Sequence, residues 1–154
     1  MTSPHTRLAP HVQAFFTEHL CHQKRVSPQT IASCRDTFRL LLTFMKETVG
    51  IEPSALRVTD LDAPLVLRFL DYLEHQRGNT VRSRNIRLSA LRTFCRFVAL
   101  RAPESIAIAT RVLAIPLKRE DKHLVGYLTR EEMEALLAAP DRSQWVAVAI
   151  MRSC

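Results

Sequence analysis

The sequence predicts an all-α fold, and three features of the chain support this prediction. Apolar residues recur at spacings of three and four, as they do on the core-facing side of a helix. The alternation of apolar and polar residues that is typical of a half-buried strand is hard to find. Only three of the 154 residues are glycine, and 47% are apolar, which is enough for a hydrophobic core. We therefore expect a bundle of four main helices followed by a short C-terminal helical fragment.

The first two helices are expected over residues 8–24 and 28–49. Ser27 and Pro28 form a start signal, because serine caps a helix and proline is tolerated at its first position. Arg35 and Arg39 fall on one side of the second helix. Thr30 lies in its first turn, where free backbone amides attract an anion such as phosphate. Thr30 can equally be an ordinary helix-start residue.

The third and fourth helices are expected between Asp62 and Gly78 and over residues 79–100. Asp62 can cap the third helix, and Gly78 can end it in the left-handed conformation. Asn79 is the expected cap of the fourth helix, and Pro103 bounds it. A fifth short helix or turn is expected over residues 106–115, which are mostly apolar.

The fourth helix has a basic polar face opposite its apolar face. At 3.6 residues per turn this face contains Arg82, Asn85, Ser89, Arg92 and Arg96. No Asp or Glu occurs between Glu74 and Glu104, and the basic residues from 77 to 101 are all arginine, which binds phosphate and guanine in bidentate fashion. The pattern favours nucleic-acid binding, although a run of basic residues can also be a solvated surface. The candidate DNA ligands are Thr30, Arg35, Arg39, Arg82, Arg84, Asn85, Arg87, Ser89, Arg92, Arg96, Lys118 and Arg119.

The charge and the cysteines restrict the class of protein further. The net charge of +7 favours DNA, RNA or an anionic membrane surface as partner. No apolar run approaches the ~20 residues that cross a bilayer, and the N-terminus has no signal-peptide core. The four cysteines lack metal-ligand spacing, which indicates reduced thiols in a cytoplasmic protein. His19 and His22 share a helix face without further ligands, so we expect neither a metal nor a cofactor.

The C-terminal part is expected to be an inter-domain linker and the start of a second domain. Residues 116–127 are charged and lack apolar periodicity. Lys118 and Arg119 in this segment can follow a phosphate backbone or belong to a solvated tether. Thr129 and Glu132 form a capping box for a short helix, and an apolar segment then runs to Cys154. An apolar helix cannot bury itself in so small a module, so we expect a domain cut off near its beginning.

Several motifs in this order resemble the tyrosine recombinases, also called phage integrases. The motifs are Ser27-Pro28-Gln29-Thr30, Asn79-Thr80, residues 84–94, residues 115–119 and residues 127–132. The resemblance implies a SAM-like core-binding domain over residues 1–115, a linker over 116–127 and a truncated catalytic domain over 128–154. It also implies double-stranded DNA as partner, with the second and fourth helices facing the duplex, in DNA integration and recombination.

The resemblance does not extend to the residues that perform strand exchange in that family. The family uses a tyrosine nucleophile together with arginine, lysine and His or Trp groups, all in the catalytic domain. Tyr72 and Tyr127 do not match the nucleophile's motif, and Arg152 lacks the glycine that normally precedes the first catalytic arginine. We therefore expect no catalysis by this chain alone.

Several alternatives remain open at this stage. Other recombinase protomers, a second chain that supplies the catalytic half, and an acidic protein partner bound by a helical interaction module are all compatible with the sequence. So are a relic of a mobile element and a competitor for recombination sites.

Overall fold

The computed structural model describes residues 7–120 and 129–138, and every regular element in these two ranges is a helix. The chain divides into two units, residues 1–120 and 121–154. One isolated antiparallel bridge joins Arg7 to Arg57. None of the described helices is long and apolar enough to span a lipid bilayer. The all-α prediction is confirmed.

The first two predicted helices are present, and both change to π-helical register, the first before its midpoint and the second near its C-terminal end. Helix α1 (Leu8–Ala14) continues directly into the π-helix η2 (Phe15–Gln23). Helix α2 (Pro28–Phe44) continues into the π-helical turn η3 (Met45–Val49). Ser27 caps α2, since its Oγ accepts the backbone N–H of Thr30 at 3.2 Å. This agrees with the start signal in the sequence.

Helices α3 (Ala63–His75), α4 (Val81–Arg101) and α5 (Ile106–Leu113) follow, with the short 3-10 turns η4 (Val58–Asp60) and η5 (Pro103–Ser105) before α3 and α5. Asp62 caps α3 by accepting the N–H of Leu65 at 2.9 Å. The expected cap of α4 was wrong, because Thr80, not Asn79, accepts the N–H of Ser83. Asn79 instead closes α3, where its N–H donates to the carbonyl of Leu73 after the left-handed Gly78 (φ +63°).

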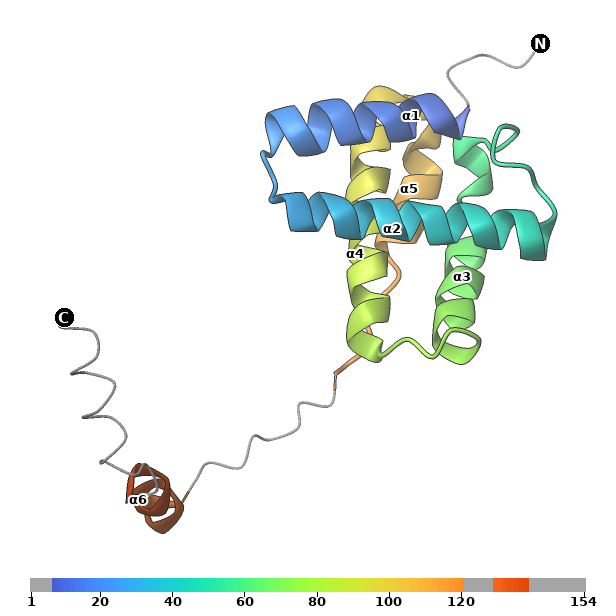
Figure 1. Cartoon of the computed structure of the whole chain (residues 1–154). Helices are drawn as coiled ribbons and strands as arrows, with labels where there is room; N and C mark the ends of the chain where they lie inside the picture. The colour runs from blue at the N-terminus through green and yellow to red at the C-terminus, as the bar shows by residue number, and fades with distance from the viewer. Residues whose placement is uncertain (1–6, 121–128, 139–154) are drawn as a thin grey trace, which may run out of the picture. The chain divides into compact units, whose positions relative to one another are not determined.

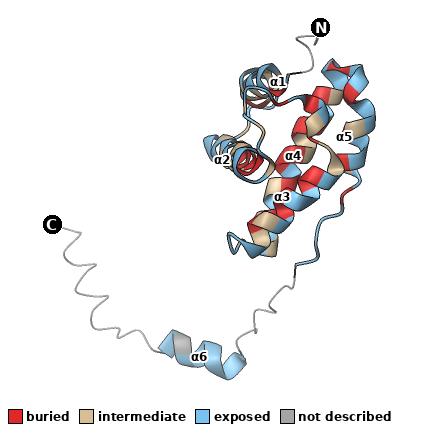
Figure 2. Ribbon diagram, turned by 90° about the vertical axis from the view of Figure 1, so that its right-hand side faces the viewer, coloured by how far each residue is buried: buried red, intermediate tan, exposed pale blue. Residues whose placement is uncertain are grey.

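Helix α4 is central to the first unit and packs against α2, α3 and α5. The antiparallel α1 and α2 run across α3 and α4, as Figure 1 shows. The buried residues lie on the facing sides of these helices (Figure 2). Phe15, Phe38 and Phe94 join α1–η2, α2 and α4, and their ring centroids are 5.0 Å apart for Phe38–Phe94 and 5.4 Å for Phe15–Phe94. This aromatic contact fixes α2 against α4, the two helices with predicted ligands.

The second unit contains α6 (Arg130–Ala138) among its described residues. Its capping box is present as predicted. The backbone N–H of Glu132 donates to Thr129 Oγ1 at 3.3 Å, and that of Thr129 donates to Glu132 Oε2 at 2.9 Å. The predicted apolar helix near the C-terminus, Tyr127 and Arg152 lie outside the described residues.

Candidate nucleic-acid interface

The polar face of α4 consists of Arg82, Asn85, Ser89, Arg92 and Arg96, as the helical periodicity predicted. Arg82, Ser89 and Arg96 are exposed, and Asn85 and Arg92 are half-buried. The helix contains six arginines and no acidic residue. Its positive charge is therefore not balanced by carboxylates of the same helix, and three of its arginines lie on one surface.

A groove of about 620 Å³ lies between this face and the start of α2. It brings together four of the predicted ligands, Thr30 from α2 and Arg82, Asn85 and Ser89 from α4. Lys24, Ser27 and Ser33 also line it, as does Glu120 at the end of the first unit. The groove therefore offers hydroxyl, amide and cationic groups on two helices, which are the groups that bind phosphates and base edges.

The predicted ligands on α2 do not all lie at the groove. The Thr30 Oγ1 and Ser27 Oγ atoms are 2.9 Å apart, so the Thr30 hydroxyl bonds within the cap and still faces the groove. Arg35 and Arg39 are exposed but are not part of the groove wall. Arg39 forms an exposed ion pair with Asp36 at 3.1 Å, which contributes little to stability. Their contact with a ligand stays a prediction.

Arg84 is a correction to the sequence prediction. Its side chain is buried, with 4% of the residue exposed, and its Nε lies 3.6 Å from Glu74 Oε1 on α3. The guanidinium also donates through Nη1 to Asn85 Oδ1 at 3.2 Å. Its burial withdraws Arg84 from a ligand in this conformation, and the residue lies about a third of a turn of the helix away from the centre of the polar face.

Arg87 is a second correction, since it joins α4 to α2 instead of facing outward. Its guanidinium donates to Asp36 Oδ2 at 2.5 Å, to Thr37 Oγ1 at 3.1 Å and to the Ser33 carbonyl at 3.0 Å. Only 17% of its side chain is exposed. Arg84 and Arg87 belong to the basic run of the sequence, but their phase on the helix puts them on the side that faces the other helices.

Asn85 and Lys118 contact each other, which the sequence did not indicate. Asn85 Nδ2 donates to the Lys118 carbonyl at 2.8 Å, and the Lys118 N–H donates to Asn85 Oδ1 at 3.1 Å. Lys118 Nζ donates to Glu74 Oε2 at 2.5 Å. Both polar ends of the Asn85 amide are thus engaged by backbone, whereas Arg119 is exposed. No local pattern could reveal a contact between residues that lie 33 positions apart.

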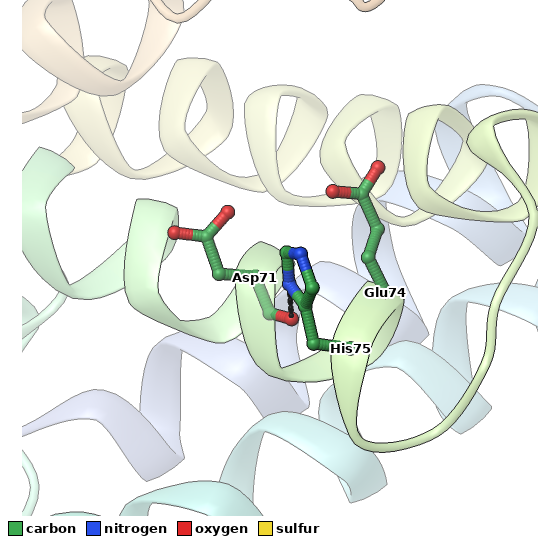
Figure 3. Close-up of side chains that lie close together, drawn as sticks. All are labelled: Asp71, Glu74 and His75. Atoms are coloured by element: carbon green, nitrogen blue, oxygen red, sulfur yellow. Dashed lines mark hydrogen bonds between the residues drawn. The ribbon is translucent and has the colours of Figure 1, made fainter.

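One cluster in the described ranges has the composition of a metal site, namely Asp71, Glu74 and His75 on α3. Figure 3 shows the His75 ring between the two carboxylates, with Nδ1 bonded to the Asp71 carbonyl at 3.0 Å. Glu74 is already neutralised by the side chains of Arg84 and Lys118. One of its three members, Glu74, is therefore already engaged by a cation of α4 and a cation of the segment after α5.

Two thiols close to the α4 core are held in the protonated form. Burial raises the pKa of Cys95 from 9.0 to about 12. Burial also raises the pKa of Cys34, and the positive charge of Arg87 partly opposes this shift. Both thiols are buried, while Cys21 is exposed. Neither buried thiol is suited to act as a nucleophile at neutral pH.

The first unit is a small all-helical domain with a basic face on α4, and comparison with known families shows which family it belongs to. Residues 14–102 match the family model described as "Phage integrase, N-terminal SAM-like domain". These residues include α2, α3, α4 and the polar face. The chain therefore belongs to the phage integrase family, as the sequence motifs indicated, and its fold is SAM-like.

Two relatives come from Sinorhizobium fredii (strain NBRC 101917 / NGR234). The chain is 51% identical over 141 residues to a protein named "Putative integrase/recombinase y4rC", covering 92% of this chain and 42% of that protein. It is 42% identical over 139 residues to "Putative integrase/recombinase y4rD", covering 90% of this chain and 50% of that protein. The chain thus spans half or less of the length of these relatives. No solved structure shows significant similarity.

Proposed function

We propose that the first unit binds double-stranded DNA as the core-binding domain of a site-specific recombinase. The observation that supports this most strongly is the polar face of α4, which carries Arg82, Arg92 and Arg96 and whose Arg82 also lines the groove. Neither α4 nor the described groove wall apart from Glu120 contains a carboxylate, so the surface attracts a polyanion. Membership of the phage integrase family makes a recombination site the matching polyanion.

The residues of the face divide into two roles under this proposal. Arg82, Arg92 and Arg96 neutralise phosphates and position the duplex, which gives affinity without sequence information. Ser89 and the Thr30 hydroxyl bond to phosphate or base edges from the two sides of the groove. Asn85 is less suited to reading a base than the sequence indicated, because its amide is bonded to Lys118.

The chemistry of recombination belongs, in this proposal, to a catalytic domain that begins near residue 128. Residues 1–115 are the DNA-binding domain, and residues 116–127 are the linker, whose first part is held on α4. The chain by itself binds DNA and does not exchange strands. Tyr72 is half-buried against Phe44 at 5.2 Å between ring centroids, which is unsuitable for a nucleophile.

A charge-matched pair of variants tests the proposed face. The test variant is Arg82→Ala, Arg92→Ala and Arg96→Ala; the control is Arg57→Ala, Arg68→Ala and Arg111→Ala, three exposed arginines outside the face. Both remove three positive charges, so a difference between them reports the surface and not the net charge. Titration of a labelled random-sequence duplex should show at least a tenfold weaker affinity for the test variant and a small change for the control.

Salt and heparin complete this experiment. If about six phosphates are neutralised, wild-type affinity should fall roughly a thousandfold between 50 and 200 mM salt, and the slope should be shallower for the test variant. A folded test variant with unchanged affinity would refute the face. Equal affinity for heparin and duplex would instead favour the other candidate, a basic helical module for an acidic protein partner.

A further inference from the structure

The segment that follows α5 does not leave the first unit as a free tether. Ile115 is buried, with 5% exposed, and the Asn85 side chain is hydrogen-bonded to both the backbone N–H and the backbone carbonyl of Lys118. An asparagine side chain offers one acceptor and two donors, so it can pair with a peptide as a neighbouring strand does. Lys118 is therefore held at α4 by a side chain of the proposed DNA-binding face.

Two charged residues support Asn85 from the interior. Arg84 donates to Asn85 Oδ1 and lies 3.6 Å from Glu74, whose second carboxylate oxygen accepts from Lys118 Nζ. The side chains of Arg84 and Glu74 are only 5% and 12% exposed. The Arg84–Glu74 contact is an ion pair without a hydrogen bond at Arg84 Nε. The Asn85 amide is held in one orientation by its own bonds, from Arg84 Nη1 and the Lys118 N–H to Oδ1 and from Nδ2 to the Lys118 carbonyl. Glu74, Arg84, Asn85 and Lys118 thus form one connected network, which we call the latch.

We propose that Asn85 is a positioning residue, which fixes the start of the linker along α4 so that the linker completes the DNA-binding surface. Asn85 and Glu120 both line the groove, and Asn85 binds the backbone of Lys118, two residues before Glu120. Arg119 lies between Lys118 and Glu120 in the chain and is exposed. The latch itself is a feature of the first unit, while its contribution to DNA affinity rests on the proposed function.

Hydrogen exchange of the Lys118 amide tests the latch without DNA. In the full chain, Asn85→Ala should accelerate exchange of this amide about tenfold, because the bond that protects it is removed. Ser89→Ala, on the same face one turn further on, should leave the rate unchanged. In Lys118→Ala the amide of residue 118 should exchange more slowly than the same amide in Asn85→Ala, because Asn85 bonds to the backbone and this bond survives the loss of the lysine side chain. Equal rates in wild type and Asn85→Ala would overturn the latch.

A double-mutant cycle with Arg119 tests the consequence for DNA. Arg119→Ala should weaken duplex affinity roughly fivefold in the wild-type background, as expected for one lost phosphate contact. In the Asn85→Ala background, Arg119→Ala should reduce duplex affinity by a clearly smaller factor, because Arg119 is no longer held in place. Equal losses in both backgrounds, or no loss in either, would refute the positioning role in DNA binding.

The two experiments separate the latch from the proposed function. If wild type binds no duplex while Asn85→Ala still accelerates exchange at Lys118, the DNA-binding proposal fails and the latch stands. If Asn85→Ala weakens DNA binding without changing exchange, Asn85 contacts DNA directly and the positioning role is refuted.

Discussion

Replacing Arg87 by alanine would remove the main polar connection between α2 and α4. The substitution deletes three hydrogen bonds, to Asp36, Thr37 and the Ser33 carbonyl. It also leaves the Asp36 carboxylate, whose side chain is 37% exposed, without its inner partner. A hydrogen bond to a charged group contributes about 1.5–3 kcal/mol, and partial hydration of Asp36 reduces the penalty for leaving it unpaired. We expect the free energy of unfolding to fall by about 3 kcal/mol.

Thermal unfolding followed by circular dichroism measures this loss. For a unit of this size, ~3 kcal/mol corresponds to a decrease in Tm of about 10 °C. The exposed Arg35→Ala on α2 is the control and should change the free energy by less than about 0.5 kcal/mol. In the double variant with Asp36→Ala, the loss should be at least ~1 kcal/mol smaller than the sum of the single losses. An Arg87→Ala protein as stable as wild type would refute the assignment of Arg87 to the helix interface.

Two further predictions concern a thiol and a helix cap. Because burial raises the pKa of Cys95 to about 12, a thiol reagent at pH 8 should label the exposed Cys21 quickly and Cys95 only after unfolding. The folded protein binds this proton more tightly than the unfolded chain, so stability should fall as pH rises from about 9 toward 12, and Cys95→Ala should show a smaller fall over that range. Rapid labelling of Cys95 in the folded protein would contradict its burial. Asp62→Ala removes the N-cap of α3 and should cost about 1 kcal/mol in urea unfolding, whereas an unchanged midpoint would show that the cap contributes nothing.

The fold was predictable because its signals are local. Apolar spacing located every main helix of the first unit, and Ser27 and Asp62 marked two helix starts correctly. The errors at this level also have local causes. Asparagine is a residue type that suits a helix cap, but after the left-handed turn at Gly78 the N–H of Asn79 donates to the Leu73 carbonyl and closes α3. The π-helical register of η2 and η3 left no signal in the spacing.

The site was less predictable, because its details depend on contacts between distant parts of the chain. Helical phase placed Arg82, Arg92 and Arg96 on one face, and the same phase argued against Arg84 and Arg87. The role of Asn85 could not be predicted, because it binds backbone N–H and C=O groups, which every non-proline residue of the chain carries. Glu74 appeared only as the boundary of a basic run, whereas it pairs with cations on α4 and beyond α5.

Helix α4 has no acidic residue of its own, so its stability depends on charges supplied by other parts of the molecule. Its counterions come from other helices, Asp36 on α2, Glu74 on α3 and Glu18 on η2. As an isolated peptide, α4 would carry repelling positive charges and would form little helix in water. The helix is therefore stabilised by its contacts with the neighbouring helices. A bound polyanion would supply negative charge along its outer side and raise the melting temperature of the whole unit.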